Sequence, residues 1–338
     1  MTCGHSLQWM AFLLSLVNIP FAPSVRIELR KGRKIMKYIE YGHMKASVLV
    51  AGTMRIANFT DEMTEAYIKG VLDCGINFFD HADIYGAGHC EELFGKYLKD
   101  HPEDRNRMYI QSKCGIRKGY FDFSYEHIIE AVEASLTRLN TDHLDCLLLH
   151  RPDALMEPEE INRAFNKLHA EGKVLNFGVS NMNRYQIELL KSKLDLPIVT
   201  NQLQMSIVHT PLLDSGFNVN MNDDPSIMRD AGTLEYMRLN GMVMQVWSPL
   251  QISYFNGSFL DSDKYPELNE LMTELGEKYE CEKDAIAYAW ILRYPLASQV
   301  VLRSTGLDHI KAGTKASDIT LEKEEWYRLY KAAGNRLP

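Results

Sequence analysis

Four polar residues follow apolar runs that have the composition of buried β-strands. Asp80 and Tyr85 follow one such run, Lys113 follows a second, and His150 follows a third. In a parallel α/β barrel, residues just past the strand ends meet at one mouth. The four side chains are therefore predicted to share one site.

These residue types fit the reduction of a carbonyl group, which needs a hydride on carbon and a proton on oxygen. A free tyrosine, with a pKa of about 10, is a poor proton donor at neutral pH. A nearby ammonium stabilises the phenolate, so Lys113 would activate Tyr85, while Asp80 would keep Lys113 charged and oriented. His150 would donate a hydrogen bond to the substrate oxygen. Taken singly, each residue has a structural reading, such as a salt bridge or a satisfied polar group at a strand end, and only the combination indicates catalysis.

The order of the four residues resembles the catalytic tetrad of the aldo-keto reductases, and the resemblance runs from about Met36 to the end of the chain. It implies reduction of an aldehyde or ketone by NADPH without a metal, with Tyr85 as the general acid. The expected partner is a small carbonyl substrate, and its identity stays open among sugar aldehydes, pyridoxal, quinones and glycerol-type alcohols.

The predicted cofactor site lacks the Gly-rich fingerprint that opens a Rossmann fold. Instead, Arg303, Ser304 and Thr305 follow the last predicted strand, where a barrel commonly binds phosphate. An ordinary capped helix with a surface arginine is the alternative reading. The resemblance places the 2′-phosphate of NADP at these three residues, which favours NADPH over NADH, and His309 is included although the family often has arginine there.

Four further motifs carry the resemblance, namely G-T at 52–53, G-V-S-N at 178–181, N-Q at 201–202 and W-S-P-L at 247–250. They imply cofactor contacts by Thr53, Arg55, Ser180, Asn181, Gln202, Trp247, Ser248 and Leu250. Ser180, Asn181 and Gln202 would hold the nicotinamide carboxamide, on which Trp247 would stack. Arg55 would lie beside the pyrophosphate.

An apolar substrate pocket is predicted from Met54, Tyr120 and Met205, together with Phe121 and Trp247. Met54 stands where the family frequently has an aromatic residue. That departure bears on which carbonyl compound the pocket prefers.

Apolar runs and helical periods alternate along the chain, which predicts an α/β fold, a (β/α)8 barrel with an N-terminal β-hairpin and a C-terminal helix. The expected strands are 48–52, 76–82, 108–113, 144–150, 174–179, 198–203, 242–247 and 300–302. The expected helices are 61–74, 91–98, 124–139, 158–169, 184–192, 226–239, 266–279, 283–293 and 321–333. Residues 42–43 would form the hairpin turn, and 218–224 a polar loop.

Composition limits the function classes. The 338 residues carry a net charge of −8, which argues against a nucleic-acid partner. The six cysteines are scattered, which predicts a reducing, cytoplasmic location and no structural zinc. The apolar run 9–21 is too short to span a membrane, so residues 1–35 are predicted to be an extension outside a barrel domain of residues 36–338, with a membrane anchor as the alternative.

A non-enzymatic alternative is an NADP-binding regulatory subunit that resembles the potassium-channel β subunits, which share this fold. Such subunits also keep the catalytic residues, so the tetrad alone does not separate the two functions.

Overall fold

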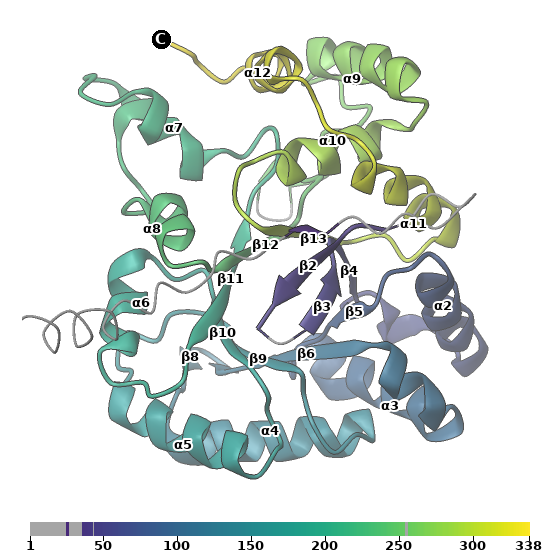
Figure 1. Cartoon of the computed structure of the whole chain (residues 1–338), viewed down its shortest axis with the longest axis vertical. Helices are drawn as coiled ribbons and strands as arrows, with labels where there is room; N and C mark the ends of the chain where they lie inside the picture. Colours follow the sequence, from purple (N-terminus) through teal and green to yellow (C-terminus); the bar gives the residue numbers. More distant parts are fainter. Residues whose placement is uncertain (1–24, 27–35, 43, 254–255) are drawn as a thin grey trace, which may run out of the picture.

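Eight parallel strands close into a barrel in the computed structural model, which describes residues 25–26, 36–42, 44–253 and 256–338. In order around the barrel they are β4 (Leu49–Gly52), β5 (Phe78–Asp80), β6 (Tyr109–Cys114), β9 (Cys146–Leu149), β10 (Phe177–Ser180), β11 (Ile198–Gln204), β12 (Val243–Trp247) and β13 (Ser298–Leu302). The last strand pairs with the first, with Val300 opposite Leu49. The predicted (β/α)8 barrel is confirmed (Figure 1).

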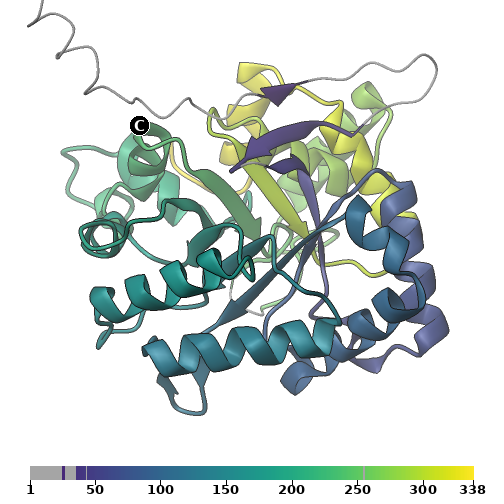
Figure 2. The same cartoon turned by 60° about the horizontal axis from the view of Figure 1, so that its bottom comes forward.

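Helices surround the barrel and cover the outer faces of its strands (Figure 2). They are α2 (Asp61–Asp73), α3 (His89–Asp100), α4 (Tyr125–Leu139), α5 (Pro158–Ala170), α6 (Arg184–Lys191), α8 (Thr233–Leu239), α9 (Pro266–Tyr279), α10 (Lys283–Leu292) and α11 (Leu307–Gly313). Local signals explain several boundaries. The Thr60 hydroxyl accepts the Met63 backbone N–H at 3.3 Å and so caps α2, and Gly75 follows the end of that helix with a left-handed φ of 80°.

The predicted hairpin is formed by β2 (Tyr38–Tyr41) and β3 (Met44–Ser47), and it lies across the end of the barrel that faces the viewer in Figure 1. The Ser47 backbone N–H donates to Asn77 Oδ1 at 2.8 Å, just before β5. Gly42 is required at the turn, since it has a φ of 57° and a Cβ there would lie 2.1 Å from Asn176 Oδ1. The hairpin therefore closes the end of the barrel at which the strands begin.

Most of the predicted extension, residues 1–24 and 27–35, lies outside the described residues. Its Val25 and Arg26 form β1 (Val25–Arg26), which pairs antiparallel with β2. This short pairing adds a third strand to the hairpin.

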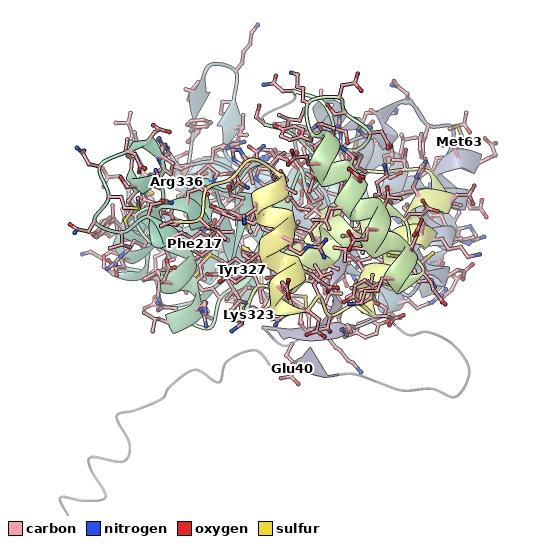
Figure 3. All side chains as sticks on the ribbon, turned by 90° about the horizontal axis from the view of Figure 1, so that it is seen from above. Glu40, Met63, Phe217, Lys323, Tyr327 and Arg336 are labelled. Atoms are coloured by element: carbon pink, nitrogen blue, oxygen red, sulfur yellow. The ribbon has the colours of Figure 1, made fainter. Side chains whose placement is uncertain are left out.

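The predicted C-terminal helix is α12 (Lys323–Ala332), which packs on α10 through two tryptophans. The Trp290 and Trp326 rings stack at 4.7 Å between centroids, and each indole N–H donates to the other residue's carbonyl at 3.0 Å. On the other side of α12, Phe217 packs edge-on against Trp326, Tyr327 and Tyr330, as the labelled Phe217 and Tyr327 in Figure 3 illustrate. Aromatic contacts thus hold the end of the chain against the barrel.

The prediction of one helix over 226–239 is wrong in its first half. A 3-10 turn, η4 (Asp224–Ser226), comes first, and α8 begins only at Thr233. Gly232 has a φ of 70°, and the Asp230 carboxylate accepts the backbone N–H of Thr233 at 2.9 Å, so the chain turns before the helix starts. The short elements that were not predicted include α7 (Pro211–Phe217) and the hairpin of β7 (Ile116–Arg117) with β8 (Tyr120–Phe121).

Gly95 lets α3 approach α4 closely. A Cβ at Gly95 would lie 1.9 Å from the Arg138 carbonyl oxygen, which belongs to the backbone and cannot move aside cheaply. Gly95→Ala is therefore expected to lower the free energy of unfolding by about 1–3 kcal/mol, despite the better helix propensity of alanine. Urea unfolding measures this. Gly216→Ala in α7 is the control because its Cβ would meet nothing within 4 Å, and an equal effect of the two substitutions would contradict the packing argument.

Candidate active site

The Lys113 ammonium is the centre of the site. Its Nζ donates to Asp80 Oδ2 at 2.8 Å, to the His81 carbonyl at 2.7 Å and to the Tyr85 hydroxyl at 3.2 Å. The Lys113 side chain is 0% exposed and that of Asp80 is 3% exposed. All three ammonium protons therefore have an acceptor, and one of those acceptors is the phenol oxygen.

The loop that carries Tyr85 is tied to the strand that carries Lys113. The Asp83 backbone N–H donates to the Lys113 carbonyl at 3.1 Å, so both sides of the contact share one framework. Tyr85 opens the 3-10 turn η2 (Tyr85–Gly88), in which Gly86, Ala87 and Gly88 all have left-handed φ values, of 58°, 55° and 95°. The turn leads directly into α3, which anchors the loop from the other side.

His150 lies across the site from Tyr85, with 6.1 Å between the ring centroids. Its backbone N–H donates to the Cys114 carbonyl at 2.9 Å, one residue past Lys113. Burial, and then the charges of Lys113 and Arg151, hold the pKa of His150 well below 6.5. The imidazole is therefore neutral at pH 7 and can donate a hydrogen bond without carrying a charge.

Burial and the ion pair act in opposite directions on the other two groups. Burial raises the pKa of Tyr85 above 10, and the Lys113 charge works against that rise. For Lys113, burial acts to lower the pKa, but attraction to Asp80 and Tyr85 outweighs it, so the pKa is raised above 10.5. The amine stays protonated at neutral pH, and the phenol keeps its proton next to a permanent cation.

A cavity of about 950 Å³, counted to its open mouth, reaches these groups. Of the predicted residues, its lining includes Met54, Arg55, Asp80, Tyr85, His150, Ser180, Asn181, Gln202, Trp247, Ser248 and Arg303. Outside that lining the structure places Thr53, Lys113, Tyr120, Phe121, Met205, Leu250, Ser304, Thr305 and His309. Of these, Lys113 hydrogen-bonds to Asp80 and Tyr85, which both line the cavity. Tyr120 lies exposed on β8, Met205 is fully buried, and His309 is exposed on α11.

The residues of three separate motifs meet on one wall of the cavity. Asn181 has a left-handed φ of 56°, and its Nδ2 donates to Ser180 Oγ at 2.7 Å. Asn181 Oδ1 accepts the Trp247 indole N–H at 3.2 Å, and Ser180 Oγ donates to the Gln202 carbonyl at 3.1 Å. These hydrogen bonds fix the polar groups relative to the indole.

Arg55 and Arg303 place two cations in the lining of the cavity. Burial, and then the charge of Arg55, lowers the pKa of Arg303 from its ordinary value, and Arg303 Nε is buried without a hydrogen-bond partner in the described part of the chain. Within that same part neither guanidinium forms an ion pair. Two neighbouring cations without a counter-charge fit a ligand that brings several negative charges, as the phosphates of a dinucleotide do.

Comparison with known proteins decides the family. The model of the aldo/keto reductase family matches residues 48–333. The chain belongs to the aldo-keto reductases.

This aldo-keto reductase is 35% identical over 285 residues to the oxidoreductase YdhF of Escherichia coli, which covers 82% of this chain and 89% of YdhF. It is 33% identical to a 6-dehydroglucose reductase of Agrobacterium fabrum, with 86% and 95% of the two chains covered. An aldo-keto reductase of Klebsiella pneumoniae, solved in complex with NADPH, has the same fold with a TM-score of 0.70, at 21% identity and over 90% and 97% of the chains. The relatives confirm that the protein is an oxidoreductase.

A more distant relative belongs to the second predicted class. A putative voltage-gated potassium channel β subunit of Schizosaccharomyces pombe is 28% identical, over 75% of this chain and 79% of its own.

Sequence reasoning missed several residues that line the cavity of the reductase. They are Ile84, Ile116, Arg151, Gln251, Val301 and Leu302. Adjacency is the signal that was available for two of them, because Ile84 precedes Tyr85 and Arg151 follows His150. The Arg151 guanidinium lies 5.4 Å from the centre of the Trp247 ring, which brings a cation into the part of the cavity near His150.

Two features are absent from the described residues of the reductase. Among them, no group of three or more His, Cys, Asp or Glu side chains is placed to hold a metal ion. No helix in those residues has the length and apolar character needed to cross a membrane.

Fully buried His81 makes the stability of the reductase depend on pH. Its Nδ1 lies 3.0 Å from Thr53 Oγ1, and burial, followed by the Lys113 charge, lowers its pKa to about 3. The unfolded chain takes up this proton near pH 6.5 and the folded one does not, so the contribution to stability is present above pH 6.5 and is lost as the pH falls. Between pH 6.5 and pH 5 the loss is about 2 kcal/mol.

Urea unfolding of wild type and His81→Asn at pH 7 and pH 5 tests this. The variant is expected to lose about 2 kcal/mol less than wild type over that interval, whatever its stability at pH 7. His150 contributes equally to both proteins and cancels in the comparison. An identical pH dependence in both would show that His81 is not the titrating group.

Proposed function

We propose that this protein reduces an aldehyde or ketone to an alcohol with NADPH, and that Tyr85 supplies the proton. One observation carries the proposal: the buried Lys113 ammonium contacts the Asp80 carboxylate and the Tyr85 hydroxyl at once, and Asp80 and Tyr85 both line the cavity. The family of the chain and its oxidoreductase relatives support the same reaction class.

The residues around the cavity fit the cofactor. Arg55 and Arg303 would neutralise its phosphates, and the polar wall of Ser180, Asn181 and Gln202 would hold its carboxamide. Bound NADPH would supply the hydride. The Klebsiella aldo-keto reductase complex supports the choice of cofactor by analogy of fold.

Proton transfer would proceed from Tyr85 to the substrate oxygen as negative charge develops there. The phenolate left behind would be stabilised by the Lys113 ammonium, which Asp80 keeps charged and oriented. Neutral His150 would donate a hydrogen bond to the same oxygen and so orient the carbonyl group. In the direction of alcohol oxidation, the same phenolate would act as the base.

The cavity suits a small carbonyl compound with some polar character. Met54, Ile84, Ile116 and Trp247 supply apolar lining, and Arg151 adds a cation. The 6-dehydroglucose reductase relative makes sugar aldehydes a sensible first group in a substrate panel, alongside aromatic aldehydes and quinones.

We also propose a cytoplasmic location and a catalytic unit of residues 36–338. The described cysteines, Cys74, Cys90, Cys114, Cys146 and Cys281, are all free thiols, which supports a reducing compartment. The contacts of the hairpin with the barrel support its inclusion in the unit.

Tyr85→Phe tests the assignment of the general acid. The substitution removes only the hydroxyl, so kcat with a saturating aldehyde is expected to fall by about 10²-fold or more. NADPH binding, measured by fluorescence quenching, should stay close to wild type. Tyr185→Phe on the exposed face of α6 is the control. A Tyr85→Phe protein with near-normal kcat would sink the assignment.

Arg303→Ala tests the choice of cofactor. A charge-assisted hydrogen bond is worth roughly 1.5–3 kcal/mol, or about 10–150-fold in affinity. If Arg303 contacts the 2′-phosphate, NADPH binding should weaken by about that factor while NADH binding barely changes. Arg328→Ala on α12, whose partner is Glu274, controls for loss of a surface cation. Equal losses for both cofactors, or a wild-type preference for NADH, would overturn this role.

The similarity to a putative potassium channel β subunit supports a second candidate function, in which the protein reports the NADP redox state to a partner protein. Rapid steady turnover of an aldehyde by a protein that runs as a monomer favours the enzyme. A tetramer with bound NADPH and no steady turnover favours the regulatory subunit.

A further inference from the structure

Asp80 has a second set of contacts that the proposed reaction does not use directly. Its Oδ1 accepts hydrogen bonds from Gln111 Nε2 at 2.6 Å and from Gln202 Nε2 at 3.0 Å. The same two Nε2 atoms also donate to Gln245 Oε1, at 2.9 and 3.1 Å. One oxygen of Asp80 thus binds Lys113, and the other is held by two amides that share a third amide as their acceptor.

The contacts continue from Gln245 to the far end of the barrel. Gln245 Nε2 donates to Gln299 Oε1 at 2.9 Å, and Gln299 Nε2 donates to the Ser47 backbone carbonyl at 2.7 Å. We call the side chains of Gln111, Gln202, Gln245 and Gln299 the amide relay. They come from β6, β11, β12 and β13, and each is at most 3% exposed.

Both ends of the amide relay can only accept hydrogen bonds. The Ser47 carbonyl requires the NH₂ group of Gln299, which leaves Gln299 Oε1 to face Gln245. The same reasoning passes from Gln245 to Gln111 and Gln202, whose NH₂ groups must point toward Asp80. Reversing any one amide would place two donors or two acceptors face to face in a buried site, which is costly.

The surroundings of the amide relay contain one ion pair and otherwise neutral groups. Gln111 Oε1 accepts a hydrogen bond from the Tyr41 hydroxyl at 3.3 Å, and Cys146 Sγ lies 3.5 Å from that hydroxyl. Burial, then Cys146, raises the pKa of Tyr41 well above 10, and burial raises that of Cys146 to about 12. Asp80 and Lys113 are therefore the charged groups that the relay meets at neutral pH.

Barrel interiors are commonly filled with branched apolar side chains, which fill space without polar groups to satisfy. Here four amides occupy the interior and converge on the carboxylate that orients Lys113. Space filling alone gives no reason for that polarity.

We propose that Gln111, Gln245 and Gln299 are positioning residues for the reaction. They act through Asp80: the relay holds its carboxylate in one orientation, which aims the Lys113 ammonium at the Tyr85 hydroxyl. The hairpin residue Ser47 sets the direction of the whole relay. This inference rests on the proposed reductase function and adds residues that touch neither substrate nor cofactor.

Gln245→Glu is the decisive variant because the carboxyl group has the shape of the amide. In its protonated form it can donate to Gln299 Oε1 and accept from Gln111 and Gln202, so the relay is preserved. In its ionised form it cannot donate, and it adds a negative charge near Asp80. We expect kcat to approach wild type at low pH and to fall by about 10–100-fold relative to wild type as the pH rises. Gln245→Met, which keeps the length without the polar atoms, should lower kcat about 10-fold or more at every pH.

Asn269→Asp is the matched control. Asn269 is also a buried amide, but it lies in α9 and its partners are Asp261, Phe259 and Tyr265, away from the relay. This substitution should lower stability and leave the pH profile of kcat unchanged. Circular dichroism confirms folding of each protein, and Gln245→Glu alone decides the question if Gln245→Met does not fold.

The outcomes separate this inference from the function on which it rests. A wild-type protein that turns over no aldehyde sinks the proposed function and the relay's catalytic role with it. An active wild type whose pH profile is shared by Gln245→Glu overturns the inference alone. Loss of kcat at high pH in Gln245→Glu, with an unchanged profile in Asn269→Asp, supports it.

Discussion

The site depends on one constraint: the Lys113 ammonium lies in the interior of the barrel and must be stabilised there. An isolated buried charge costs several kcal/mol, so Lys113 is tolerable only with an opposite charge and an acceptor for each proton. Asp80 supplies the opposite charge and accepts one N–H, the His81 carbonyl accepts the second, and the Tyr85 hydroxyl accepts the third. The phenol is thus part of what makes the buried lysine stable, and under the proposed function the same contact would prepare the phenol to give up its proton.

Two features of the mouth follow from that arrangement. His150 is buried close to a fixed cation, and burial first, then that charge, lowers its pKa and keeps the imidazole neutral and suited to donating a hydrogen bond. Arg55 and Arg303 repel each other at the cavity wall, so the protein without ligand holds an unfavourable pair that an anionic ligand relieves. The repulsion between the two arginines lowers the stability of the folded protein without ligand, and the same repulsion favours binding of an anionic ligand in the cavity.

Sequence reasoning predicted that Asp80, Tyr85, Lys113 and His150 lie together, because the carboxyl ends of parallel strands share one edge. It located the eight strands by their apolar runs. It failed where three-dimensional context decides. Gln111 and Gln245 look like ordinary polar positions inside apolar strands, and nothing local indicates that they face each other. Met205 reads as a pocket residue by its place after a strand, but the chain turns there and buries it completely. The seven residues of α7 are too few for a helical period to stand out.

The closure of the barrel between β13 and β4 has a consequence for how the protein is made. Gln299 and Ser47 are 252 residues apart in the chain, so their hydrogen bond forms only after Gln299 has left the ribosome. Contacts of such long range form late, because the entropy of bringing distant segments together must be overcome first. A growing polypeptide therefore contains Asp80 and Lys113 long before it contains Gln299, the last member of the amide relay. Closure of the barrel and completion of the amide relay therefore depend on the same late-synthesised strand, β13.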